Sequence, residues 1–209
     1  MAMTARSTSS GKRGRPREFD RAQALERALS LFWRRGYEGT SIADLTAAMR
    51  VAPPSLYAAF GSKDKLFREA VELYVSKYAG YAARALAEEP TAYRAFARLL
   101  SESANEYASG GKPPGCLVAS GLLSCAKRHA KAARTMSERR LLSRDMLKSR
   151  LDRAVKDGEL PAGTNTAGLA TFYAAVVQGM SVQAIDGATR NQLQMIAGTA
   201  MAAWPKKTS

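Results

Sequence analysis

Four side chains in the first third of the chain carry groups that could bind phosphate. Thr40, Ser55 and Tyr57 supply hydroxyls, and Lys63 supplies an ammonium group. Such groups donate hydrogen bonds to phosphate oxygens and position a protein on a nucleic-acid backbone without reading the base sequence. We interpret these four residues as candidate phosphate contacts.

A basic segment precedes them. Residues 1–17 contain five Lys or Arg side chains and no acidic one, a composition typical of a flexible basic arm. An arginine-rich arm ahead of a helix-turn-helix can enter a narrow, electronegative minor groove. We therefore name Arg13, Arg15 and Arg17 as candidate DNA contacts. The alternative is a solubilising tail, because charged runs are usually solvated.

The elements that must position these groups are predicted to be short helices. Apolar residues recur at three- and four-residue intervals from Leu25 to Phe32 and predict a helix over 21–35, which Gly36 can end in a left-handed cap. Ser41 and Asp44 have the spacing of a capping box and predict the start of a second helix, which ends near residue 49.

A third helix is predicted over residues 53–60, after a turn of only three residues. Pro53 and Pro54 suit its first turn, where amide protons have no acceptor within the helix. Two short helices joined by such a turn, behind a supporting helix, have the spacing that lets the last helix enter a major groove.

Three segments carry a resemblance to a known family. Residues 14–20 (GRPREFD), 28–41 (ALSLFWRRGYEGTS) and 55–67 (SLYAAFGSKDKLF) are similar to the N-terminal domain of the TetR family of regulators, over about residues 14–75. The resemblance implies a homodimer on a roughly palindromic operator of double-stranded DNA, with recognition helices in major grooves about 34 Å apart. It also implies that a small-molecule effector relieves repression.

By this resemblance, Thr40, Tyr57 and Lys63 match phosphate-contacting positions and residues 52–55 match positions that meet base edges. The candidate DNA contacts are Arg13, Arg15, Arg17, Thr40, Ser41, Ala52, Pro53, Pro54, Ser55, Tyr57 and Lys63.

Two departures from the family pattern concern the turn and the third helix. Arg50 stands where many members have glycine, and a left-handed backbone there costs about 1 kcal/mol. Either the turn differs slightly, or Arg50 contributes a phosphate contact. Pro53 and Pro54 leave few donors for base readout, so specificity would depend on thymine methyl contacts, DNA shape and the arm.

The remaining chain also has helical periodicity, and no segment alternates as a strand would. A long fourth helix from residue 63 could extend past Tyr81, and later helices are expected over 91–108, 116–126, 129–156, 166–186 and 190–204. The expected fold class is all-α. Its divisions are a basic arm (1–17), a helix-turn-helix domain (18–65) and a helical effector-binding and dimerisation domain (66–209).

Aromatic stripes in this second domain predict an apolar pocket with a few polar groups. A plain core is the commoner reason for such stripes. The pocket candidates are Tyr74, Tyr78, Phe96, Ser103, Tyr107 and Cys125.

The last two helices offer small and apolar residues that permit close helix approach. By resemblance they form an isologous dimer interface with their counterparts in a second copy. The candidate interface residues are Phe172, Val176, Gly179, Met180, Leu193, Ile196, Ala200 and Trp204.

Cys125 and His129 are i, i+4 neighbours that could share a metal or form a reactive thiol. Two such ligands are too few for a closed site, so we expect no metal, no cofactor and two structural cysteines. Cys116 would lie some 13 Å from Cys125 along a continuous helix, too far for a disulfide. Two cysteines without a disulfide framework fit a reducing cytoplasm.

The chain has 209 residues and a net charge of +14, a field that attracts nucleic acid or anionic membrane. The apolar stretch 117–126 is about half the length needed to span a bilayer, so we expect no membrane partner. Residues 127–156 carry eleven basic and three acidic side chains. This run is either a solvated face or a surface that attracts an anionic ligand or a second DNA segment.

Two other classes of protein fit the sequence less well. An enzyme is not expected, because the single histidine and the absence of a Gly-rich loop or nucleophile elbow leave no acid-base-nucleophile set. A basic architectural protein would account for the charge but not for the helix-turn-helix spacing.

Overall fold

The computed structural model describes residues 20–123 and 125–205, and within these ranges every regular element is a helix. This confirms the expected all-α class. The candidate arm contacts Arg13, Arg15 and Arg17 lie outside the described residues. The helices are α1 (Arg21–Arg35), α2 (Ile42–Met49), α3 (Pro53–Phe60), α4 (Lys63–Lys77), α5 (Gly80–Glu88), α6 (Ala92–Tyr107), α7 (Leu117–Ser120), the 3-10 helix η1 (Lys127–His129), α8 (Ala130–Lys156), α9 (Thr166–Ile185) and α10 (Arg190–Ala202).

The predicted boundaries of α1, α2 and α3 are confirmed, and local hydrogen bonds explain them. The Asp20 carboxylate accepts the Gln23 amide at the start of α1. Gly36 ends that helix as predicted, but with φ 68° and ψ 179° it has a positive φ without the expected left-handed helical conformation. Ser41 and Asp44 form the reciprocal capping box at the start of α2. Each of these interactions spans only a few residues, so residue types alone predict it.

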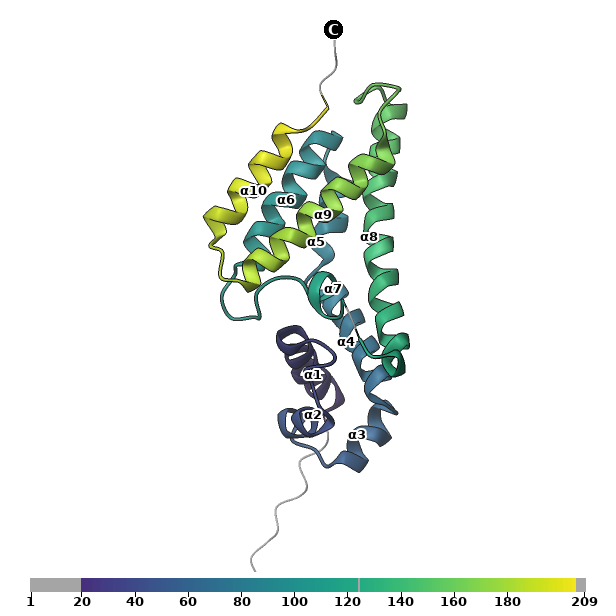
Figure 1. Ribbon diagram of the computed structural model, residues 1–209, viewed down its shortest axis with the longest axis vertical. Helices are drawn as coiled ribbons and strands as arrows, with labels where there is room; N and C mark the ends of the chain where they lie inside the picture. Colours follow the sequence, from purple (N-terminus) through teal and green to yellow (C-terminus); the bar gives the residue numbers. More distant parts are fainter. Residues whose placement is uncertain (1–19, 124, 206–209) are drawn as a thin grey trace, which may run out of the picture.

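Two apolar clusters hold the chain together. The first cluster contains residues of α1, α2, α3 and α4 and includes Phe32, Leu45 and Phe67. The second cluster contains residues of α5, α6, α9, α10 and the later part of α8. The long helix α8 takes part in both, because Met136 packs in the first cluster and Leu151 in the second. In Figure 1, α1, α2 and α3 lie at one end of an elongated molecule, and α8 runs along its side.

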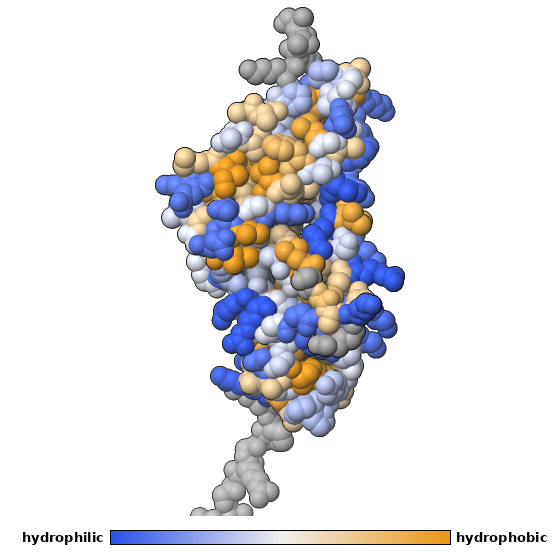
Figure 2. Space-filling model, in the orientation of Figure 1, coloured by the Kyte–Doolittle hydropathy of each residue, from blue (hydrophilic) through white to orange (hydrophobic). Residues whose placement is uncertain are grey.

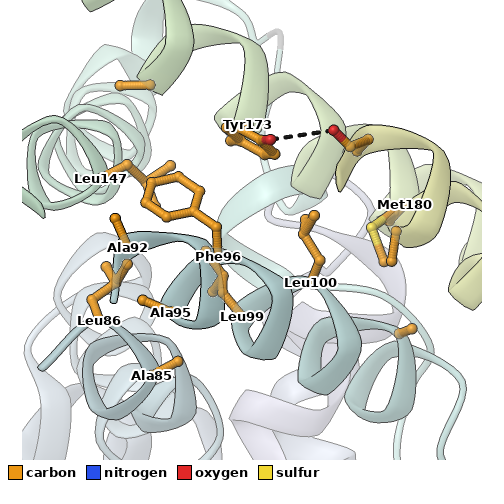
Figure 3. Close-up of a cluster of buried hydrophobic side chains, with 14 of the residues drawn as sticks. Ala85, Leu86, Ala92, Ala95, Phe96, Leu99, Leu100, Leu147, Tyr173 and Met180 are labelled. Atoms are coloured by element: carbon orange, nitrogen blue, oxygen red, sulfur yellow. Dashed lines mark hydrogen bonds between the residues drawn. The ribbon is translucent and has the colours of Figure 1, made fainter. Parts of the chain in front are cut away.

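The second cluster centres on aromatic contacts between α6, α9 and the residues after α10. The rings of Phe96 and Tyr173 lie 4.8 Å apart, and Trp204 lies 5.3 Å from Phe96. The Tyr173 hydroxyl donates to the carbonyl of Ala200 at 3.2 Å, the dashed contact in Figure 3. These contacts fasten the last helix to the domain.

The expectation that the fourth helix extends past Tyr81 is wrong. The helix α4 ends at Lys77, and α5 begins at Gly80. Glycine is a poor residue for a helix interior, which favours a break here. Tyr81 of α5 has its hydroxyl 3.0 Å from that of Ser103 on α6.

The expected helix over 116–126 is also wrong. Only the single turn α7 forms, and the chain then leaves helical geometry. The carbonyl of Gly121 accepts the backbone amide of Tyr37, from the turn after α1, at 3.1 Å. A contact between residues so distant in sequence cannot be read from local periodicity.

One apolar segment was missed in the sequence. The helix α9 has no charged residue and is long and apolar enough, by length and composition only, to cross a bilayer. A core helix of a globular protein meets the same criterion, and α9 packs against α6, α8 and α10. It therefore gives no indication of a membrane protein.

Candidate nucleic-acid interface and cavity

The helix α3 presents the predicted base-contacting positions on its outer surface. Ala52, Pro53, Pro54 and Ser55 are exposed, whereas Leu56 behind them is fully buried. Tyr57 is 47% exposed and stands on the same outward side. The arrangement leaves the start of α3 free to enter a groove.

Thr40 has a different role from the predicted one. The residue is buried, and its hydroxyl donates to the carbonyl of Gly36 at 2.7 Å. It thereby satisfies a carbonyl at the end of α1, and its side chain presents no surface to a phosphate. Neighbouring Ser41 is exposed and accepts the Asp44 amide at 3.0 Å. The hydrogen bond from the Ser41 hydroxyl is the main cause that lowers the pKa of the Asp44 carboxyl.

Lys63 is the first residue of α4, where helix amides and the helix dipole favour an anion. Its ammonium group lies 4.1 Å from the centre of the Tyr37 ring. The Tyr37 hydroxyl in turn donates to Asp64, and burial followed by this hydrogen bond raises the pKa of Tyr37 well above its ordinary range. Lys63 is thus held against a rigid aromatic support.

Arg50 adopts the left-handed conformation, with φ 58° and ψ 47°. It is the one non-glycine residue with positive φ in the described part of the chain. Of the two alternatives left by the sequence, an altered turn is therefore wrong. Its exposed side chain projects from the turn between α2 and α3.

A cavity of about 250 Å³ lies in the second domain, among α5, α6, α7, α8 and α9. Its wall is mostly apolar and also contains two guanidinium groups. Among its lining residues are Tyr81, Leu99, Tyr107, Cys116, Val118, Arg139, Arg140 and Leu147.

Of the predicted pocket residues, Tyr107 lines this cavity and the other five do not. Tyr74 and Tyr78 instead pack on Trp33 of α1, with ring centres 4.7 and 5.1 Å away. Tyr81, near the start of α5, lines the cavity.

The other misplaced candidates lie in the two cores. Phe96 packs on Tyr173, and the Ser103 hydroxyl donates to the Leu99 carbonyl at 2.8 Å. Cys125 packs against the first cluster. Cys116, which is not among the predicted pocket residues, lines the cavity. Both cysteines are free thiols.

His129 connects the second domain to the turn after α1. Its ring lies 5.1 Å from that of Tyr37, and its Nε2 lies 3.7 Å from the Glu38 carboxylate. The assumed helical pairing of Cys125 with His129 is wrong, since Cys125 precedes η1 in irregular backbone. Within the described ranges, no cluster of three metal-ligating side chains occurs.

The predicted dimer residues divide between the surface and the core. Phe172 is 41% exposed, but Met180 and Leu193 are fully buried within their own chain. Exposed apolar residues that sequence reasoning missed lie on the same helices: Val182, Ile185 and Met195. Figure 2 shows apolar surface gathered over α9 and α10. The absence of charged residues from α9 was the signal that could have found Val182 and Ile185.

These features define a helix-turn-helix protein with a separate cavity-bearing helical domain. The model of the family described as "Bacterial regulatory proteins, tetR family" matches residues 24–70. The HTH-type transcriptional repressor ComR of Escherichia coli (strain K12) is 35% identical over 195 residues, covering 93% of each chain. The repressor BdcR of the same organism is 38% identical over 111 residues, covering 53% of this chain and 56% of its own.

A solved structure agrees over nearly the whole fold. The TetR family transcriptional regulator CifR, as a cysteine mutant complexed with 26-bp double-strand operator DNA, superposes with a TM-score of 0.88 and 44% identity, covering 92% of this chain and all of that one. The chain belongs to the TetR family. It is a DNA-binding transcriptional regulator.

Proposed function

We propose that the protein is a homodimeric repressor that binds a palindromic operator through α2 and α3 and releases it when a small molecule fills the cavity. The observation that carries the proposal is the exposed face of α3, set beside the left-handed turn at Arg50. The similarity to CifR, whose structure holds operator DNA, supports it.

The proposed DNA contacts are divided by chemistry. Ala52, Pro53, Pro54 and Ser55 would face base edges, whereas Ser41, Tyr57 and Lys63 would hold phosphates, joined by Arg50. Proline carbons suit contact with thymine methyl groups, since proline has no amide proton to donate. The arm contacts remain predictions.

The proposed dimer interface is the exposed apolar surface of α9 and α10. Only 28% of the α9 segment is buried within a single chain, although the helix carries no charge. A second copy packed on Phe172, Val182 and Ile185 would cover it, and a two-fold axis would set two recognition helices on successive grooves. We propose that Met180, Leu193 and Ala200 support this surface from within.

We propose that the DNA-binding domain ends near residue 65, inside α4. Leu66 and Phe67 of this helix pack with α1 in the first cluster. We propose that α4 belongs to both domains and, with the segment after α7, transmits the state of the cavity to α3. We also propose a cytoplasmic, non-enzymatic role.

Selection of genomic fragments by the purified protein tests the proposal. The expected product is an inverted repeat with half-site centres about one helical turn apart, bound by two chains as measured by light scattering of the complex. Selection of fragments without a shared repeat would overturn the proposal and favour a basic architectural protein.

A further inference from the structure

Arg140 is a half-buried cation in the wall of an apolar cavity. It lines the cavity from α8 beside Val118, Met146 and Leu147. Among the described residues, no carboxylate lies within 4.0 Å of its guanidinium group, and burial lowers its pKa. An unpaired charge in apolar surroundings is costly, whereas an anion bound there would restore the pairing.

Several other cations of α8 have carboxylate partners. Arg139, which also lines the cavity, forms an ion pair with Glu72 of α4. Arg150 pairs with Glu159 at 3.2 Å, and Lys148 with Asp152 at 2.7 Å. The helix still keeps most of its excess positive charge, and Arg140 differs from these paired residues because it lines the cavity without a carboxylate partner among the described residues.

The cavity volume of about 250 Å³ suits a small ligand. Tyr81, Leu99 and Leu147 offer apolar walls but no further charge. A small apolar body with one anionic group matches these surfaces.

We infer that the cavity binds a small amphipathic carboxylate, with its apolar body against Tyr81, Leu99 and Leu147 and its carboxylate on the guanidinium group of Arg140. The inference rests on the proposed effector site and names its ligand class. The planar guanidinium fork matches the two oxygens of a carboxylate.

The hydrogen bonds of Arg140 connect the cavity to the segment that supports the DNA-binding helices. Its Nη1 donates to the carbonyls of Val118 at 3.2 Å and Leu122 at 3.4 Å. These two carbonyls flank Gly121, which accepts the amide of Tyr37. A carboxylate that draws the guanidinium group away from them would loosen this segment where it supports the end of α1, so the ligand would favour a different arrangement of the two domains.

Calorimetric titration with octanoate and the uncharged octanamide tests the inference. The intact protein is expected to bind octanoate at least tenfold more tightly than octanamide. In Arg140→Gln this preference should fall to near one while octanamide still binds, because the glutamine amide can donate to one carbonyl but carries no charge. Arg134→Gln is the control, since Arg134 is exposed on the same helix and does not line the cavity.

Three results would overturn the inference: equal binding of both probes by the intact protein, binding of neither, or an unchanged preference in Arg140→Gln. If Arg140→Gln fails to fold, Arg140→Lys keeps the charge without the planar fork. It should then retain the preference for octanoate at a reduced ratio, and a loss of all preference in this variant would count against the inference. Operator binding without ligand is measured on the same preparations. A protein that binds its operator but shows no preference for octanoate would contradict the carboxylate inference and leave the proposed DNA-binding function intact.

Discussion

Arg50 holds the backbone between α2 and α3 in a conformation that L-residues other than asparagine and aspartate rarely adopt. The amide of Arg50 donates to the Ala47 carbonyl and that of Val51 to the Thr46 carbonyl, so the turn is closed as a glycine would close it. A side chain kept at such a position at a cost of about 1 kcal/mol needs a compensating role. Contact with a phosphate, as proposed above, would supply one, because the side chain is exposed.

Replacement of Arg50 tests this role. Arg50→Gly should raise the free energy of unfolding by up to about 1 kcal/mol, since glycine adopts the left-handed conformation without a steric penalty. It should also weaken operator binding and reduce the slope of log affinity against log salt by about one. Chemical denaturation and salt-dependent titration measure the two effects. Arg50→Asn is the control for the backbone, and an unchanged salt slope in both variants would exclude the phosphate contact.

Replacement of Lys63 and replacement of Tyr57 should have different effects on the salt dependence of DNA binding. Lys63→Ala removes a charge and should reduce the salt slope by about one, whereas Tyr57→Phe removes only a hydroxyl and should weaken binding without changing the slope. Both should weaken binding to operator and to unrelated duplexes alike. Titration at several salt concentrations separates the two, and a loss confined to the operator would contradict their assignment to phosphates.

At the scale of elements, the single turn α7 and the residues after it join the cavity to the DNA-binding helices. Val118 lines the cavity, whereas Leu117 and Leu122 pack in the first cluster. A Cβ at Gly121 would lie 2.6 Å from Leu117 Cδ1, and one at Gly36 would lie 2.9 Å from the Gly121 carbonyl oxygen. Gly36 is therefore needed for the close approach of the two segments, and Gly121 for the packing of the turn against Leu117.

Gly121→Ala should therefore destabilise the protein by about 1 to 3 kcal/mol, the usual cost of overpacking a closely packed site. Gly163→Ala is the matched control, because a Cβ there meets nothing within 4 Å and its φ is not positive. It should change stability by no more than about 0.5 kcal/mol. Denaturant unfolding measures both, and equal stability of the two variants would contradict the close contact.

The exposed apolar side of α9 leads to a second prediction at this scale. Val182→Asp should convert the dimer to a monomer and abolish operator binding, because a buried, unpaired carboxylate at an interface is strongly unfavourable. Leu141→Asp on α8 provides the control, since Leu141 is 44% exposed and Val182 is 43% exposed. Light scattering reports the mass, and a dimer that survives Val182→Asp would place the interface elsewhere.

The elements also show which parts of the fold could be predicted from sequence. The starts of α1 and α2 could be, because Asp20, Ser41 and Asp44 act within three residues of their partners. The irregular backbone after α7 could not be predicted, because the Tyr37 amide that donates to the Gly121 carbonyl comes from another domain. Tyr74 and Tyr78 were misassigned to the pocket for a related reason, since they pack on Trp33 of α1, far away in the sequence.

At the scale of the whole molecule, the net charge of +14 accounts for attraction to DNA but not for choice of sequence. Part of the charge is neutralised within the fold, as at Arg139 with Glu72. Choice of sequence requires two copies of α3 at a fixed spacing, which the dimer would provide. The proposed effector would act at the same scale, by a coupling of typically about 1 to 3 kcal/mol between cavity and operator.

The most direct test of sequence-specific binding is a salt-controlled titration of the selected inverted repeat against a scrambled duplex of equal length. The repeat is expected to bind at least about a thousandfold more tightly at physiological salt. Comparable affinities for the two duplexes, both falling steeply as salt rises, would contradict sequence-specific binding.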